Sequence, residues 1–402
     1  MSETNIVVVG LGYVGIPVAT AVSEIENFEV FGLDIDQEKI TGLREKKDFS
    51  MTTDYSVVQQ ADKIIICLPT PVKDDAEPDL SIIQSSLTEV EKNLKAKTDI
   101  IIESTINPGV CDEKIIPLLE KNEKKLGRDF TLSHCPERIN PGDNRWNVTN
   151  IPRVLGSKDE EVAKRIKRFY EEFIDANVKV VSDVRVAEAT KIVENSFRDI
   201  NIAFVNELAQ SFDILGIDIK EVIDAASTKP FGFLPHYPGC GVGGHCIPVD
   251  PYYLINDAKV NGFTHDFLRM AREINEYMPE YTVRKVIEGL NSLEKSVKST
   301  KIAVLGLSYK AGVEDMRGSP ALKIVKELTE MEGVVEKYDP YVTENSLNDV
   351  LKHAEVAVIA TDHEEIKNNQ DWKNINLLVD GRNCLDKNQI EKEGILYEGI
   401  GR

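Results

Sequence analysis

The sequence of 402 residues predicts an α/β protein in which two Rossmann-like doubly wound domains are joined by a helical central domain with a long helix. Strand-like apolar runs alternate with helical stretches at both ends of the chain, which is typical of βαβ units and a mostly parallel sheet. Between these ends the pattern is helical, without flanking strands. We therefore predict domains at residues 1–182, 183–298 and 299–402.

The apolar runs place the individual elements. In the first domain we expect a helix after residues 10–15 that runs to about residue 26, and strands at residues 5–9, 29–33, 63–68, 99–103, 130–133, 153–156 and 178–181. The central domain is predicted to hold helices at residues 186–215, 220–226 and 266–290, with a glycine-rich loop before the last one. In the third domain we expect a helix at 321–331, a strand and turn at 301–307, and strands at 334–338, 356–360 and 376–379. The outer domains have the pattern of distant repeats of one fold.

Composition and charge exclude several classes of partner. The net charge of −20 disfavours binding to nucleic-acid phosphates or anionic lipid. The apolar runs are too short to span a membrane, and residues 1–5 lack the basic start of a signal peptide, so we expect a cytoplasmic protein. Six cysteines without a CxxC pair are expected to be free thiols. The spacing of Cys240, His245 and Cys246 fits no usual zinc pattern, so no metal is predicted.

A dinucleotide site is predicted near the N-terminus. Gly10, Gly12 and Gly15 form a GxGxxG motif between a strand and a helix, where the glycines permit a tight turn, close approach of a pyrophosphate and helix packing. Asp34 lies 19 residues after Gly15 at the end of the second strand. Its carboxylate suits a ribose hydroxyl and repels a 2′-phosphate, which favours NAD over NADP. The alternative is a glycine-rich turn that only packs a helix.

The third domain begins like the first but lacks the glycine motif. Lys310 and Arg317 follow its first strand, at the edge where open α/β sheets bind ligands. They are candidates to hold a second, phosphate-bearing ligand. The alternative is that both cations form surface ion pairs with Glu314 and Asp315.

Several polar groups indicate chemistry at a thiol. Cys246 stands in a loop with glycines at 239, 241, 243 and 244, which leave little side chain to pack. Glu137 follows a strand, and Lys191 and Asn195 share one helix face. A thiolate, a carboxylate for water and donors for an oxyanion are what aldehyde oxidation through a thiohemiacetal and a thioester requires.

These motifs, in this order, resemble the UDP-glucose/GDP-mannose dehydrogenase family over nearly the whole chain. The resemblance rests on residues 10–15, 69–71, 103–105, 136–138, 191–195, 243–246 and 310–320. It implies a two-step, four-electron, NAD-dependent oxidation of the C6 alcohol of a nucleotide sugar to the acid. It also implies a homodimer or higher homo-oligomer, with the long central helix at the dimer contact.

The resemblance assigns roles to individual residues. Cys246 would be the nucleophile and Glu137 the acid–base residue, Lys191 and Asn195 would bind the oxyanion, and Asp250 and Thr105 would assist with protons and ordered water. The implied cofactor-binding residues are Gly10, Gly12, Tyr13, Val14, Gly15, Asp34, Pro69, Thr70 and Thr105. The implied substrate-binding residues are Arg138, Lys191, Asn195, Arg198, Phe231, Gly243, Lys310 and Arg317.

Three stretches bear on the sugar. Residues 134–142 and 195–203 resemble the branch that acts on UDP-N-acetyl-hexosamines, and residues 229–235 resemble its glucosamine and galactosamine enzymes in particular. We expect UDP-N-acetylglucosamine, with UDP-N-acetylmannosamine and UDP-glucose as alternatives. Two alternatives of other kinds are a silent NAD or nucleotide-sugar sensor and an aldehyde dehydrogenase without nucleotide specificity. Residues 41–60 are shorter than the family pattern, which puts one loop beside the cofactor in doubt.

Overall fold

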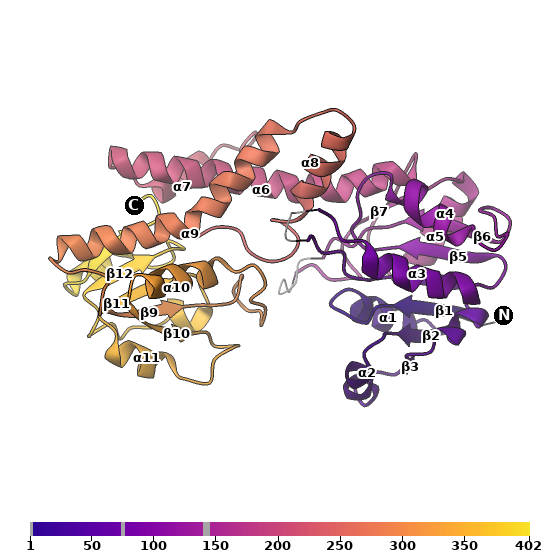
Figure 1. The fold of residues 1–402 in the computed structure, drawn as a ribbon, viewed down its shortest axis with the longest axis horizontal. Coiled ribbons are helices and arrows are strands. Elements are labelled where there is room, and N and C mark those ends of the chain that lie inside the picture. The colour runs from indigo at the N-terminus through magenta and orange to yellow at the C-terminus, as the bar shows by residue number, and fades with distance from the viewer. Residues whose placement is uncertain (1–2, 74–76, 140–144) are drawn as a thin grey trace. The chain divides into compact units, whose positions relative to one another are not determined.

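The computed structural model describes residues 3–73, 77–139 and 145–402 (Figure 1). The chain forms two compact units, which are described separately. Unit 1 comprises Met1–Glu194 with Tyr252–Phe263, and unit 2 comprises Asn195–Pro251 with Thr264–Arg402. Two of the three boundaries fall inside helices, within α6 (Val184–Leu215) and α8 (Asp250–Val260), and the third follows Phe263. The domain boundaries at residues 182 and 298 stay predictions.

Unit 1 is built on an eight-stranded sheet of order β3-β2-β1-β4-β5-β6-β7-β8. Its strands are β1 (Thr4–Val9), β2 (Phe28–Leu33), β3 (Ser50–Thr52), β4 (Lys63–Ile66), β5 (Thr98–Ile102), β6 (Phe130–His134), β7 (Arg153–Ser157) and β8 (Val178–Val181). Its helices are α1 (Gly15–Ser23), α2 (Gln37–Arg44), α3 (Ser81–Asn93), α4 (Ile116–Leu119) and α5 (Glu160–Glu171). Neighbouring strands pair in parallel, except that β6 and β7 are antiparallel. The predicted α/β class and mostly parallel sheet are confirmed.

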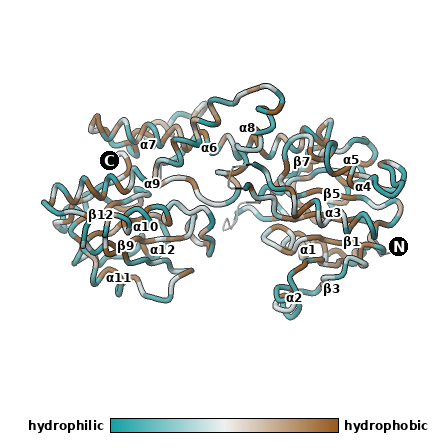
Figure 2. The backbone as a smooth tube through the Cα atoms, in the orientation of Figure 1, coloured by the Kyte–Doolittle hydropathy of each residue, from teal (hydrophilic) through white to brown (hydrophobic). Residues whose placement is uncertain are grey.

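The core of unit 1 has two layers because side chains alternate along a buried strand. Ile6 and Val8 of β1 pack into one cluster with α1 and α5, whereas Val7 and Val9 pack into another with α3 and α4. Helices thus cover both faces of the sheet, as a doubly wound fold requires. In Figure 2 the hydrophobic stretches gather along the strands of each unit.

Unit 2 combines helices with a five-stranded parallel sheet of order β10-β9-β11-β12-β13. Its strands are β9 (Lys301–Leu305), β10 (Val334–Tyr338), β11 (Val356–Ile359), β12 (Leu377–Asp380) and β13 (Leu396–Gly399). Its helices are α7 (Ile219–Ala226), α9 (Asp266–Ser292), α10 (Pro320–Glu330), α11 (Leu347–His353), α12 (Glu364–Lys367) and α13 (Lys387–Lys392), together with the C-terminal part of α6. Helices α9 and α10 cover one face of the sheet, and α11 to α13 cover the other.

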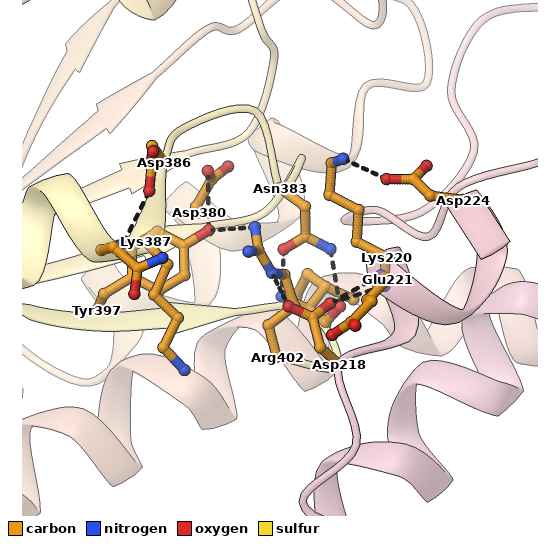
Figure 3. Close-up of polar contacts among 12 residues, drawn as sticks. Asp218, Lys220, Glu221, Asp224, Asp380, Asn383, Asp386, Lys387, Tyr397 and Arg402 are labelled. Carbon is orange, nitrogen blue, oxygen red and sulfur yellow. Dashed lines mark hydrogen bonds and ion pairs between the residues drawn. The ribbon is translucent and has the colours of Figure 1, made fainter.

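The end of the chain ties α7 to this sheet (Figure 3). Asp218 caps α7 by accepting from the backbone N–H groups of Lys220 and Glu221, and its other oxygen accepts from Arg402 Nε at 2.8 Å. Asn383 Nδ2 donates to the carbonyl of Ile400 at 2.9 Å. Helix α7, which precedes the glycine-rich loop, is therefore anchored through the last residues of the chain.

The two sheets repeat one device at the same place in their strand order. Gly10 and Gly306 follow β1 and β9 with positive φ values of 91° and 85°. A Cβ on Gly10 would lie 2.6 Å from the carbonyl oxygen of Cys67, and a Cβ on Gly306 would lie 2.5 Å from that of Thr361. Both distances are shorter than a van der Waals contact allows. In the first sheet the N–H of Leu11 donates to Asp34, which follows β2, at 2.8 Å. In the second sheet the N–H of Leu307 donates to Asp339, which follows β10, also at 2.8 Å. The structure thus agrees with the expected repeat of one fold.

Helix α8 and strands β3 and β13 are among the elements that the sequence prediction did not name. The stretch between the predicted helices at 220–226 and 266–290 was expected to be loop, but α8 occupies Asp250–Val260 within it. No strand was predicted within residues 41–60, where the short edge strand β3 lies. The last strand of the second sheet, β13, was also not predicted. Among the described residues, no helix is long and apolar enough to cross a membrane.

The start of α6 is anchored in unit 1 by a buried carboxylate. Glu188 has no exposed area and accepts from the backbone N–H groups of Gly109 at 2.6 Å and Cys111 at 2.9 Å. Gly109 precedes a helical turn and Cys111 begins it, so neither N–H group has a partner within that turn. Glu188 supplies the missing acceptor for both. The anchor lies one turn before Lys191 on the same helix.

We expect Glu188→Ala to lower the stability of unit 1 by about 3 kcal/mol, because two buried N–H donors lose their acceptor. The loss would be measured as a lower urea midpoint. Thr190→Ala, at a partly exposed position on the same helix, is the control and is expected to change stability by less than about 0.5 kcal/mol. An equal effect of both substitutions would contradict the anchor.

Candidate functional site

The glycine motif of unit 1 combines a packing requirement with an open position. A Cβ on Gly15 would lie 1.8 Å from the Gly10 carbonyl oxygen, so α1 can approach the end of β1 only if residue 15 is glycine. A Cβ on Gly12 would meet no atom within 4 Å. Packing of a helix therefore explains Gly10 and Gly15 but not Gly12, whose open surface leaves room for a pyrophosphate. Tyr13 beside it is 61% exposed.

Asp34 is held at the end of β2. It accepts from the backbone N–H groups of Leu11 at 2.8 Å and Asp36 at 3.0 Å, and from Lys39 Nζ at 2.9 Å. Burial raises the pKa of Asp34, but Lys39 and the two N–H groups outweigh it, so the pKa lies below its usual value. A carboxylate charged at neutral pH fits the expected contact with a ribose.

The ends of β4 and β5 are joined by Thr70 and Thr105, two of the predicted cofactor residues. Thr70 Oγ1 donates to the Thr105 carbonyl at 2.6 Å, and the carbonyl of Thr70 accepts from the Tyr253 hydroxyl. Asn107 Nδ2 donates to the Tyr253 carbonyl at 3.2 Å. Tyr253 of α8 was missed by the sequence analysis. Pro69 is exposed on the same turn, and the partly buried Val14 lies in the glycine loop.

Glu137 lies just beyond β6 and is almost fully buried, with 6% of its area exposed. Its Oε1 accepts from the backbone N–H groups of Arg138 and Ile139, both at 2.6 Å, and its Oε2 lies 2.5 Å from Nη1 of Arg153. Arg138 itself pairs with Glu194 at 2.6 Å and donates to the Pro152 carbonyl at 2.8 Å. Arg153 was not among the predicted site residues. Residues 140–142 of the stretch compared above lie outside the described residues.

On α6 the two predicted donors lie one turn apart. Lys191 is partly buried and belongs to unit 1, whereas the buried Asn195 begins unit 2. Asn195 Nδ2 donates to Asp250 Oδ2 at 2.5 Å, so these two predicted residues are in contact. Arg198, one turn further on, is exposed.

The glycine-rich loop of unit 2 packs against the segment that carries Lys310 and Arg317. The N–H of Gly244 donates to the Arg317 carbonyl at 3.0 Å, and a Cβ on Gly243 would lie 2.7 Å from Tyr309 Cβ. The glycines are therefore needed for this close contact. The structure thus brings together Gly243 and the segment of the two predicted cations.

All six cysteines lie in the described residues, and Cys246 alone among them is exposed. Its carbonyl accepts from the N–H of Asp250 at 2.9 Å, so the thiol lies directly before the first turn of α8. The N-terminal end of a helix favours a negative charge. Within the described residues, no group of three or more His, Cys, Asp or Glu side chains is placed to hold a metal ion.

Three further predicted substrate residues, Arg317, Phe231 and Lys310, lie in unit 2. Arg317 is half exposed and pairs with Asp315 at 2.6 Å, so the surface ion pair considered as an alternative does form at this position. Phe231 is 70% exposed in the stretch before the glycine loop, and the ammonium of Lys229 lies 4.9 Å from its ring centre. Lys310 is partly buried.

Comparison with known families matches three parts of the chain to the UDP-glucose/GDP-mannose dehydrogenase family. Residues 4–49 and 43–174 match its NAD binding domain, residues 185–277 its central domain, and residues 303–387 its UDP binding domain. These matches cover most of the chain, and they include the glycine motif, Cys246 and Lys310.

The similar proteins are named for two different substrates. The chain is 35% identical over 359 residues to UDP-N-acetyl-D-glucosamine 6-dehydrogenase of Pseudomonas aeruginosa, covering 85% of this chain and 84% of the relative. It is 36% identical over 428 aligned positions to UDP-N-acetyl-D-mannosamine dehydrogenase of Pyrococcus horikoshii, covering 99% of both. A solved structure of UDP-D-ManNAc dehydrogenase from Pyrococcus horikoshii has a TM-score of 0.92 at 34% identity and covers 99% of both chains.

We expect Gly12→Ala to weaken NAD binding by roughly tenfold or more without lowering the melting temperature, because the added methyl group meets no protein atom but occupies the space for the pyrophosphate. Titration calorimetry with NAD would measure the affinity. Gly42→Ala on α2 is the matched control, since a Cβ there also meets nothing within 4 Å. Unchanged NAD affinity in Gly12→Ala would argue against the predicted cofactor position.

Proposed function

Because the chain belongs to the UDP-glucose/GDP-mannose dehydrogenase family, we propose that it oxidises the C6 alcohol of a UDP-N-acetyl-hexosamine, preferably UDP-N-acetylglucosamine, to the uronic acid. The observation that carries this proposal is the exposed thiol of Cys246, presented before α8 by a loop whose glycines pack closely on the Lys310 segment. An exposed thiol at that position is suited to attack an aldehyde. The family is NAD-dependent, and NAD accepts a hydride when it is bound.

In the proposed reaction Cys246 acts on the aldehyde formed by the first oxidation. Its sulfur forms a bond to C6 while the thiol proton passes to the aldehyde oxygen, which gives a thiohemiacetal, and this adduct loses the C6 hydride and the hydroxyl proton to become a thioester. Water then attacks the thioester, and the thiol leaves as the acid is released. Glu137 takes a proton from this water, because its carboxylate is an acceptor fixed by two backbone N–H groups.

Lys191 and Asn195 supply donors for the oxyanion that develops on the C6 oxygen. The contact between Asn195 Nδ2 and Asp250 Oδ2 supports this role, because Asp250 accepts one amide hydrogen and so orients the second. Thr105, whose carbonyl is tied to Thr70, would help to order water beside the cofactor. Lys310 and Arg317 would hold the UDP phosphates, and Arg317 would exchange its contact with Asp315 for this purpose.

The choice of sugar is supported by residues 229–235, which resemble the glucosamine and galactosamine enzymes, and by the relative from Pseudomonas aeruginosa. UDP-N-acetylmannosamine is the second candidate because the relative from Pyrococcus horikoshii carries that name at similar identity. In the proposed complex, Arg198 and Phe231 are exposed residues available to the sugar. Arg138 would reach it only by giving up Glu194.

We expect about two NADH to form per molecule of UDP-N-acetylglucosamine when the sugar is limiting and NAD is in excess, because both oxidations take place on one enzyme. Absorbance of NADH measures the yield. About one NADH would mean that the reaction stops at the aldehyde, and Cys246 would lose its proposed role. Parallel reactions with the galactosamine, mannosamine and glucose analogues would rank the substrates.

Cys246→Ala in the same assay is expected to abolish acid formation, detected by mass spectrometry of the sugar product. Cys384→Ser is the control, because this partly buried thiol lies elsewhere and contacts Asp380. Full acid formation by Cys246→Ala would rule out the thioester route.

We also propose that the chain forms a homodimer through α6. Val193, Phe197 and Phe204 share one helix face and are 56%, 49% and 52% exposed. Apolar side chains gathered on one face of a long helix are typical of an interface. Phe204→Glu is expected to weaken the dimer, and sedimentation equilibrium measures its mass. A wild-type protein that sediments as a monomer at micromolar concentration would contradict the proposal.

A further inference from the structure

A buried guanidinium lies directly behind Glu137. The side chain of Arg153 has no exposed area, and neither does that of Glu103. Nη1 of Arg153 lies 2.5 Å from Glu137 Oε2 and 3.5 Å from Glu103 Oε2. Two buried carboxylates therefore share one cation, and one of these carboxylates is the proposed acid–base residue.

The antiparallel strand β7 is the reason that the three side chains meet. Glu103 follows β5 and Glu137 follows β6, so both lie at the edge where these parallel strands end. Arg153 is the first residue of β7, and in a parallel strand it would lie at the opposite edge. Because β7 runs antiparallel to β6, with His134 opposite Gly156, its first residue instead lies beside the end of β6.

The environment of Glu103 makes its charge variable near neutral pH. Burial raises the pKa of Glu103 to about 7, although Arg153 opposes the rise, and the nearby charge of Glu137 adds to it. The titratable groups that face Glu103 from the surrounding elements are Arg153, Glu137, Tyr170, Cys67 and Cys135. The hydroxyl of Tyr170 on α5 donates to Glu103 Oε1 at 2.5 Å. Burial raises the pKa of both thiols and of Tyr170, so these groups are uncharged at neutral pH.

We propose that Arg153 is a positioning residue that holds the carboxylate of Glu137 in one orientation, and that Glu103 sets the strength of this hold by its own ionisation. The inference rests on the proposed role of Glu137 in activating water. When Glu103 is protonated, Glu137 is the one anion that pairs with Arg153 among these three side chains. When Glu103 is ionised, the guanidinium of Arg153 interacts with two carboxylates, and its attraction to Glu137 is weaker.

This arrangement affects one step of the proposed reaction. The two backbone N–H groups donate to Oε1 of Glu137, and the guanidinium of Arg153 forms an ion pair with Oε2 without hydrogen-bond geometry, so both oxygens of the carboxylate have a charged or polar contact. Loss of the contact on Oε2 would leave the carboxylate free to rotate away from the water that it deprotonates. Hydrolysis of the thioester on Cys246 would slow, whereas formation of the thioester and binding of either substrate would not.

The first test is Arg153→Lys, which keeps the charge but not the reach of the guanidinium. We expect kcat to fall by about 10²-fold, as for a misplaced catalytic group, with kcat/KM for the UDP-sugar and affinity for NAD changed by less than about twofold, because the steps up to the thioester are unaffected. The acyl-enzyme on Cys246 is expected to accumulate, which intact-mass spectrometry after acid quenching detects. Arg165→Met is the control, because Arg165 lies on α5 in the same unit and pairs with Asp99 instead.

The second test is Glu103→Gln, which removes the ionisation and nearly keeps the shape. The pH profile of the thioester-hydrolysis rate in the wild-type protein is expected to show a bend near pH 7, above which ionised Glu103 weakens the attraction of Arg153 to Glu137 and the rate falls. Glu103→Gln is expected to lack this bend. A purely structural role of Glu103 would change stability but leave the pH profile as it is. Arg165→Met should keep the wild-type profile.

The outcomes separate the inference from the function on which it rests. A wild-type protein that forms fewer than about two NADH per sugar would overturn the proposed function. If the wild-type protein forms both NADH, but Arg153→Lys hydrolyses the thioester at the normal rate and Glu103→Gln keeps the bend, the positioning role is overturned. If Arg153→Lys does not fold, as judged by circular dichroism and NAD binding, the pH profile of Glu103→Gln decides.

Discussion

Parallel strands of one sheet end at a common edge, and the candidate site of unit 1 depends on this constraint. The ends of β1, β4, β5 and β6 carry the glycine motif, Thr70, Glu103 and Glu137 in turn. Each strand is hydrogen-bonded to its neighbours and buried on both faces, so its end cannot move alone. The geometry of these polar side chains is therefore set by an apolar core that has no chemical role of its own.

Much of this arrangement could be predicted from the sequence, because its signals are local. The alternation of apolar runs indicates the sheets, and the spacing of Gly10, Gly15 and Asp34 indicates the cofactor edge. Helix α8 was missed although Asp250 followed by Pro251 is a usual helix start. The glycine-rich stretch before it favoured a loop. Strand β3 has three residues and owes its conformation to β2, so its own pattern carries little information.

Arg153 had no signal in the sequence, and the reason is physical. An arginine before an apolar run usually indicates a solvated strand end, and Glu137 lies 16 residues earlier, beyond any local pattern. Its burial depends on the direction of β7, which tertiary packing decides. Removing a guanidinium from water is unfavourable unless carboxylates compensate for it, so the antiparallel strand and the pair of Glu103 and Glu137 require each other.

The repeated glycine and aspartate have a consequence for how such chains diverge. Both sheets keep the positive-φ glycine and the aspartate that accepts from the following N–H, although the two parts match domains with different ligands. These two residues therefore serve the construction of the strand crossing itself, in addition to any contact with a ligand. The two crossings differ in the segment that follows, because Gly12 is exposed in the first, whereas Ser308 at the equivalent position is buried and is followed by Lys310 and Arg317. One strand crossing can thus keep the same steric requirement at its first glycine while the segment after that glycine differs with the ligand.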